Sequence, residues 1–249
     1  MKSKNIKSFL FIIIFFITWQ TVSYLNIYSD FLLPSPYTVL KEFSNNRLFY
    51  HILSSLKIVF MGYFIALTFA LLLSVCSLYS KSIMEYLDWS IQFFRNVPPL
   101  GMIPLLILWF GIGKTSKIII IFLASFFPML LNIEKGFKST DIKLIEVGKS
   151  FGFTKFQILE KIIFPYAIPD ILVGARIGLG YSYRAIIGAE MIASSSGLGY
   201  MIIFAKSMSN TSTVIVGIIV IGLLGLACDF LFKFFIELFL KDKKGYGWD

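Results

Sequence analysis

Residues 146–165 read EVGKSFGFTKFQILEKIIFP and form a charged segment between two long apolar stretches. Four residues stand in the frame Glu-x5-Gly-x9-Ile-x2-Pro, namely Glu146, Gly152, Ile162 and Pro165. A membrane protein that keeps folded, charged helices between its spanning helices presents a surface to water. We therefore expect this segment to be a docking element for a partner.

The composition favours a membrane protein. The chain has 249 residues, of which 57% are hydrophobic and only 15% are charged. A soluble domain of this length needs more charge on its surface. The apolar residues also lie in blocks of about 20, the length that crosses a bilayer. The net charge of +9 does not indicate nucleic-acid binding, because the lysines stand at the ends of the apolar blocks.

Six apolar blocks predict six transmembrane helices. They cover roughly residues 9–28, 56–79, 87–110, 117–133, 171–193 and 214–240. No small-x-small cleavage pattern follows the first block, so we expect it to be retained. Pro98, Pro99 and Pro104 should bend the third block. The fold class is therefore an all-α polytopic membrane protein with a single domain over residues 1–249.

The distribution of lysine and arginine predicts the topology. If the N-terminus is cytoplasmic, clearly more of these residues face the cytoplasm than the outside. This asymmetry favours two cytoplasmic termini and a cytoplasmic segment 141–168.

The first half of that segment is typical of a short capped helix. Asp141 can cap a helix over residues 142–151. Gly152 stands where a helix end favours a left-handed residue.

The second half predicts another short helix. Thr154 and Gln157 have the spacing of a capping box. Pro165 should stop this helix, and Pro169 should lead into the fifth span. An amphipathic hairpin lying on the lipid surface is the alternative interpretation.

The segment resembles the cytoplasmic signature loop of inner-membrane permeases of ATP-binding-cassette (ABC) importers. That family's pattern is Glu-Ala-Ala-x3-Gly-x9-Ile-x-Leu-Pro. Here Val147-Gly148 replaces the two alanines, and Phe164 replaces the leucine. The resemblance implies a coupling helix that fits a cleft in an ATPase subunit, with Glu146, Gly152, Ile162 and Pro165 as the ATPase-coupling residues.

Further motifs resemble one subgroup, the permeases for nitrate, sulfonate, taurine and thiamine pyrimidine precursors. They include Leu33-Pro34-Ser35-Pro36, Trp109-Phe110-Gly111, Gly174-x-Arg176, Glu190-Met191 and Gly197-Leu198-Gly199-Tyr200. The resemblance implies a type I ABC importer permease in a bacterial cell membrane, carrying a small anionic or heterocyclic solute. It also implies three partners: an ABC ATPase dimer, a second permease copy in a homodimer, and an extracytoplasmic solute-binding protein.

Nothing in the sequence indicates an enzyme. Gly113-Lys114-Thr115 resembles the end of a phosphate-binding loop, but Leu108 stands where that loop needs glycine. His51 has no cluster of acids or cysteines near it in the sequence, so we expect no catalytic residue, metal or cofactor. A secondary transporter driven by an ion gradient is the alternative function. A membrane-embedded enzyme or assembly factor is a more distant one.

Several ionisable residues lie within predicted spans, and three of them carry the most information: Arg95, Arg184 and Glu190. Each would be costly facing lipid, so we expect them to line a translocation path. In that interpretation the two arginines bias the path toward anions. In the alternative, the arginines lie near the membrane edges and extend their head groups to water.

Overall fold

Helices are the only regular secondary structure over the part that the computed structural model describes, residues 2–25, 27–44 and 46–240. The helices are α1 Lys2–Tyr24, α2 Pro36–Glu42, α3 Asn46–Tyr79, α4 Lys81–Asn96, α5 Ile103–Phe110, α6 Lys114–Lys138, α7 Ile142–Ser150, α8 Lys155–Ile158, α9 Phe164–Ile192, α10 Leu198–Ser207 and α11 Thr211–Leu240. Two turns with other geometries interrupt these helices. The 3-10 turn η1 Pro99–Met102 is tighter than an α-helix, and the π-helical turn η2 Leu159–Ile163 is wider.

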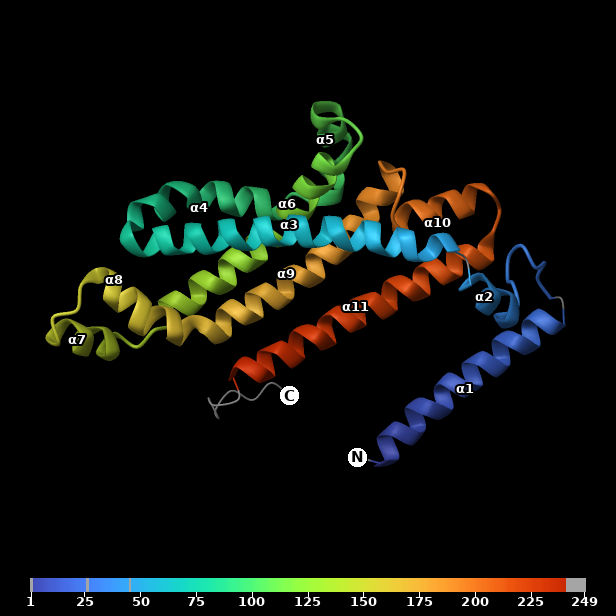
Figure 1. Cartoon of the computed structure of the whole chain (residues 1–249), viewed down its shortest axis with the longest axis horizontal. Helices are drawn as coiled ribbons and strands as arrows, with labels where there is room; N and C mark the ends of the chain where they lie inside the picture. The colour runs from blue at the N-terminus through green and yellow to red at the C-terminus, as the bar shows by residue number, and fades with distance from the viewer. Residues whose placement is uncertain (1, 26, 45, 241–249) are drawn as a thin grey trace.

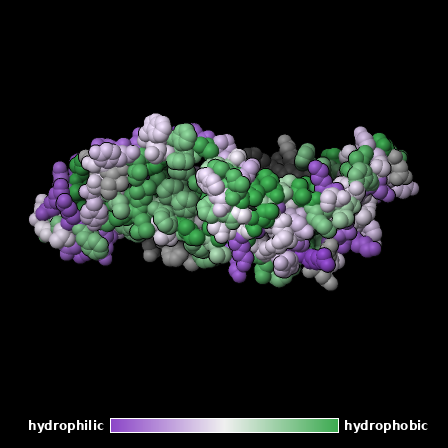
Figure 2. All heavy atoms as spheres, turned by 90° about the horizontal axis from the view of Figure 1, so that it is seen from above, coloured by the Kyte–Doolittle hydropathy of each residue, from purple (hydrophilic) through white to green (hydrophobic). Residues whose placement is uncertain are grey.

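Four segments of the described residues are long and apolar enough to cross a membrane: Arg47–Tyr79, Lys114–Lys138, Lys155–Ile192 and Thr211–Glu237. The bent pair Glu85–Asn96 and Pro99–Phe110 makes a fifth if it is one span. The six-span count therefore stays a prediction. Figure 2 shows hydrophobic residues over the middle of the face toward the viewer and more hydrophilic residues toward the two ends.

The third predicted span is broken, as its prolines predict. The two halves meet at an angle of 86° around Pro98 and Pro99. Pro104 lies in the first turn of α5, where a missing backbone N–H costs no hydrogen bond. Helix α4 runs alongside α3, and the bend turns α5 away from both (Figure 1).

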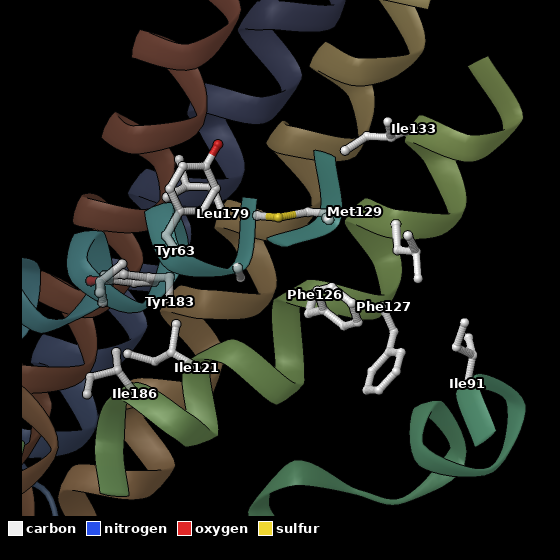
Figure 3. Close-up of a cluster of buried hydrophobic side chains, with 14 of the residues drawn as sticks. Tyr63, Ile91, Ile121, Phe126, Phe127, Met129, Ile133, Leu179, Tyr183 and Ile186 are labelled. Atoms are coloured by element: carbon white, nitrogen blue, oxygen red, sulfur yellow. The ribbon is translucent and has the colours of Figure 1, made fainter. Parts of the chain in front are cut away.

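The main core lies where α6 packs between α3 and α9. Figure 3 shows Met129 of α6 reaching toward Leu179 of α9, with Tyr63 of α3 beside them. Small residues on α9 allow this approach: a Cβ added to Gly178 would lie 2.1 Å from Met129 Cε. Gly174 and Gly178 stand four residues apart on α9, and this spacing of small residues lets two helices pack closely.

The two ends of the bundle carry different elements (Figure 1). One end carries α7 and α8, in the segment between α6 and α9. The other end carries α2 and α10, which both pack on α11. Helix α1 stands apart from the bundle in Figure 1, and its Trp19 indole N–H donates to the carbonyl of Pro34 at 3.1 Å.

Candidate functional site

Helix α7 forms as its sequence predicts. The carboxylate of Asp141 accepts the backbone N–H of Lys143 at 2.9 Å and caps the helix start. Gly152 has φ +73°, the left-handed conformation that glycine adopts without strain. Gly152 N–H donates to the carbonyl of Lys149, and Phe153 N–H donates to that of Gly148. These two bonds form a Schellman motif and reverse the chain after α7.

The predicted capping box begins α8. Thr154 Oγ1 accepts the N–H of Gln157 at 3.3 Å, and Gln157 Oε1 accepts the N–H of Thr154 at 2.8 Å. Both helix starts of the segment therefore follow from local side-chain chemistry.

The prediction that Pro165 stops the second helix is wrong. The chain stays helical from Lys155 to Ile192, through Pro165 and Pro169. The wider π-helical turn Leu159–Ile163 ends two residues before the proline, and Phe164 N–H donates to the carbonyl of Leu159. A proline lacks an N–H and crowds the carbonyl four residues earlier, and the wider turn relieves this crowding.

Helix α7 folds back on this π-helical turn. Gly148 is buried, and a Cβ placed there would lie 2.5 Å from Ile162 Cδ1. The ammonium of Lys161 lies 5.3 Å from the centre of the Phe153 ring, within cation–π range. Gly148 costs α7 some helix propensity, but it allows the contact that fixes the helix pair.

The outer face of the helix pair is apolar and uncovered. Ile142 is 69% exposed, Phe151 76% and Phe156 64%. A groove of about 510 Å³ lies between α7 and the stretch from the π-helical turn to the start of α9, and Val147, Phe151, Ile162 and Pro165 are among the residues that line it. Contiguous apolar exposure of this kind marks an interaction site.

The four predicted coupling residues divide between this groove and the surface. Ile162 and Pro165 are half-buried and line the groove. Glu146 and Gly152 are exposed and do not line it. Glu146 lies on α7, and Gly152 makes the turn after it.

Glu190 lies at the other end of α9 and is only 1% exposed. The hydroxyl of Ser55 lies 2.9 Å from one carboxylate oxygen and 2.8 Å from the other. Gly199 N–H donates to the same carboxylate at 3.0 Å, and Leu198 N–H donates to Ser55 Oγ at 2.9 Å. Glu190 thus ties α9 to α3 and to the start of α10.

The loop between α9 and α10 closes over this carboxylate. Gly197 has φ +109°, and a Cβ there would lie 2.1 Å from Glu190 Oε1. Gly197 N–H donates to His51 Nδ1 at 3.1 Å. The buried Lys117 ammonium donates to Ser194 Oγ at 2.9 Å. Helix α10 begins directly after Gly197.

The polar residues around Glu190 and around the loop that closes over it were not predicted from the sequence. Ser55, His51 and Lys117 lie far from Glu190 in the sequence and share no motif with it. Their one signal is that each is a polar residue inside, or at the edge of, an apolar block.

The two predicted path arginines are exposed. Arg95 lies in the last turn of α4. Arg184 lies on α9 and lines a cleft with Arg176 and Asp229 of α11. Arg176 and Asp229 form a two-pronged ion pair, with Nε–Oδ1 and Nη2–Oδ2 distances of 2.7 Å. Because Glu190 is buried and the arginines are exposed, the structure does not bring these three residues into one site.

Residues 58–241 match the family described as "Binding-protein-dependent transport system inner membrane component". The chain belongs to this family. These permeases are transport proteins and not enzymes, and they are components of the inner membrane. Nothing in the comparisons supports a secondary transporter.

Relatives of this permease are named for sulfonates and taurine. It is 36% identical over 232 residues to the aliphatic sulfonates transport permease protein SsuC of Bacillus subtilis. The aligned region covers 92% of this chain and 84% of SsuC. It is also 36% identical over 215 residues to the taurine transport system permease protein TauC of Escherichia coli, with 83% and 78% covered.

Solved structures share the permease fold. A chain of the inward-facing MetNI methionine ABC transporter matches with a TM-score of 0.60 at 18% identity, over 75% of this chain and 94% of that one. A chain of an amino acid ABC transporter solved with histidines matches with a TM-score of 0.63 at 19% identity, over 78% and 92%. The all-helical ABC importer permease fold predicted from the sequence is confirmed.

Proposed function

We propose that this permease is the membrane subunit of an ATP-driven importer for a small organic anion of the sulfonate type. Two copies form the translocation path, and each presents its α7–α8 pair to one subunit of an ATPase dimer. A solute-binding protein delivers the solute from outside. The observation that carries the proposal is the fixed helix pair with an uncovered apolar face.

Three features support ATPase docking at this pair. The pair is held by a cap, a Schellman motif, a capping box and the Gly148–Ile162 contact, so its shape does not depend on a partner. Its exposed apolar side chains, Ile142, Phe151 and Phe156, keep most of their surface uncovered by the described residues. Its helix continues without a break into α9, so a partner that moves the pair also moves a membrane span.

The proposed topology has six spans, with both termini and segment 141–168 in the cytoplasm. The distribution of lysine and arginine supports it. The test uses a chain with Cys76→Ser and Cys228→Ser, into which Lys149→Cys or Tyr37→Cys is introduced. A membrane-impermeant maleimide should label position 37 in intact cells, and position 149 only after permeabilisation. Labelling of position 149 in intact cells contradicts the topology.

The solute class follows from the relatives and from the arginines. We propose that Arg184 and Arg95 bias the path toward anions. Glu190 is buried in this conformation, and its predicted place along the path stays a prediction that requires the network around it to open.

Reconstituted transport tests the function as a whole. Proteoliposomes would hold the permease with its cognate ATPase subunit, ATP inside and the binding protein outside. We expect uptake of taurine or ethanesulfonate that stops when ATP is omitted. Uptake by the permease alone, driven by a proton or sodium gradient, would overturn the proposal.

A further inference from the structure

A cleft of about 220 Å³ lies between α9 and α11. On α9 it is lined by Arg176, Gly180, Tyr183 and Arg184, among others, which follow the spacing of one helix face. A Cβ added to Gly180 would meet no atom within 4 Å, so the space beside that residue is open. The cleft therefore has room for a small molecule next to two guanidinium groups.

The charges in this cleft do not balance. Both carboxylate oxygens of Asp229 accept hydrogen bonds from Arg176, at 2.7 Å each. Arg184 makes no hydrogen bond or ion pair with any residue that the structure describes. Two arginines thus face one acid, and the cleft holds one guanidinium without a counter-ion.

The position of the two arginines along α9 bears on the cost of their charges. Helix α9 runs from Phe164 to Ile192, so its midpoint is near residue 178. At 1.5 Å rise per residue, Arg184 lies about 9 Å and Arg176 about 3 Å from that midpoint along the axis. Half of the hydrocarbon core is about 15 Å thick. Both residues lie within the predicted fifth span, residues 171–193, where a charge is costly unless it has a counter-ion, an aqueous path or reach to the membrane surface.

We infer that this cleft binds a small oxyanion, held by Arg184 and by Arg176 in competition with Asp229. A guanidinium group binds sulfonate or carboxylate oxygens through two parallel hydrogen bonds. Asp229 takes this place on Arg176 while the cleft is empty. Leu179 and Phe232 also line the cleft and suit a short apolar tail, so the ligand class is a short organic sulfonate or carboxylate. The inference rests on the proposed function for the claim that this anion is the transported solute.

Ligand binding to the full-length permease in phosphatidylcholine nanodiscs tests the site without any ATPase. The probe is ethanesulfonate, followed by saturation-transfer NMR, with uncharged diethyl sulfone as the matched neutral compound. We expect Arg184→Gln to weaken ethanesulfonate binding about tenfold or more, because a hydrogen bond to a charged group is lost. Arg184→Lys should weaken it less. Lys57→Gln removes an exposed cation that does not line the cleft, and should leave binding unchanged.

The Asp229→Asn variant gives the sharpest result. If Asp229 competes with the ligand, its removal should strengthen ethanesulfonate binding several-fold. If the ion pair serves only to hold α9 against α11, the variant should lose thermal stability and gain no affinity. Unchanged affinity in a folded Asp229→Asn chain, or equal binding by wild type and Arg184→Gln, overturns the inference.

A lipid headgroup offers the same anionic oxygens, so the assay is repeated with phosphatidylglycerol added to the nanodiscs. Ethanesulfonate affinity should not change; a marked loss would assign the cleft to lipid and overturn the solute site. ATP-driven uptake by the wild type is measured in parallel. Uptake without ethanesulfonate binding refutes only this inference, whereas binding without ATP-driven uptake refutes only the proposed function.

Discussion

The hydroxyl of Ser55 lies within 3 Å of both carboxylate oxygens of Glu190, and so joins the first part of α3 to the last turns of α9. The same hydroxyl oxygen accepts the N–H of Leu198, the first residue of α10. One serine therefore connects three helices at the end of the bundle opposite α7 and α8.

Replacing Ser55 with alanine should destabilise the fold by about 1–3 kcal/mol, because a buried carboxylate and a buried N–H both lose a partner. The midpoint of thermal unfolding in detergent measures this. Ser207→Ala is the matched control, since its exposed hydroxyl bonds only to its own helix at Phe204. Equal midpoints for the two variants would show that the Ser55 contact adds nothing to stability.

Replacing Gly197 with alanine should cost about 3 kcal/mol or more. The left-handed backbone disfavours a side chain, and the new Cβ would overlap Glu190 Oε1. Gly113→Ala is the control, because its backbone is extended and nothing lies within 4 Å of an added Cβ. The yield of folded, monodisperse protein and its unfolding midpoint should fall for the first variant alone. Normal yield and stability of Gly197→Ala would contradict the loop geometry.

Gly152→Ala tests the turn between α7 and α8. An added Cβ meets nothing within 4 Å, so the expected cost of about 1–2 kcal/mol comes from the left-handed backbone alone. Hydrogen exchange should speed up in residues 142–158 and stay unchanged in α6 and α9. Gly152→Asn should have a smaller effect, because asparagine tolerates this conformation better. Equal effects of alanine and asparagine would rule out backbone strain as the cause.

Phe151→Ala should weaken capture of the ATPase subunit without harming the permease itself. The ring is 76% exposed, so its loss should change the stability of the permease by no more than about 0.5 kcal/mol. Co-purification of tagged ATPase measures the docking. Phe49→Ala removes a ring that is 70% exposed near the start of α3, at the opposite end of the bundle, and serves as the control. Undiminished capture by Phe151→Ala would remove this face from the docking site.

The helix pair could be predicted from the sequence because its signals are local. Asp141, Gly152 and the Thr154–Gln157 box each act within a few residues of their own position. The bend after α4 was predictable for the same reason, because Pro98 and Pro99 restrict their own backbone.

The remaining features depend on contacts between distant residues. Pro165 has the local signal of a helix end, but the π-helical turn before it keeps the helix continuous. The Ser55–Glu190 contact joins residues 135 positions apart. The Arg176–Asp229 pair joins residues 53 positions apart. No periodicity or cap in one segment indicates which residue of another segment will face it.

The unbroken helix from Lys155 to Ile192 has a consequence for how force travels through the subunit. Its 38 residues give a rod about 57 Å long. A displacement at its docked end must either carry Glu190 away from Ser55 and Gly199 or be absorbed where the backbone is weakest. The weakest stretch is the π-helical turn with Pro165 and Pro169 after it, because hydrogen bonds are displaced or missing there. In the proposed function, the stiffness of about ten residues would thus set how much of an ATPase-driven movement reaches the far side of the membrane.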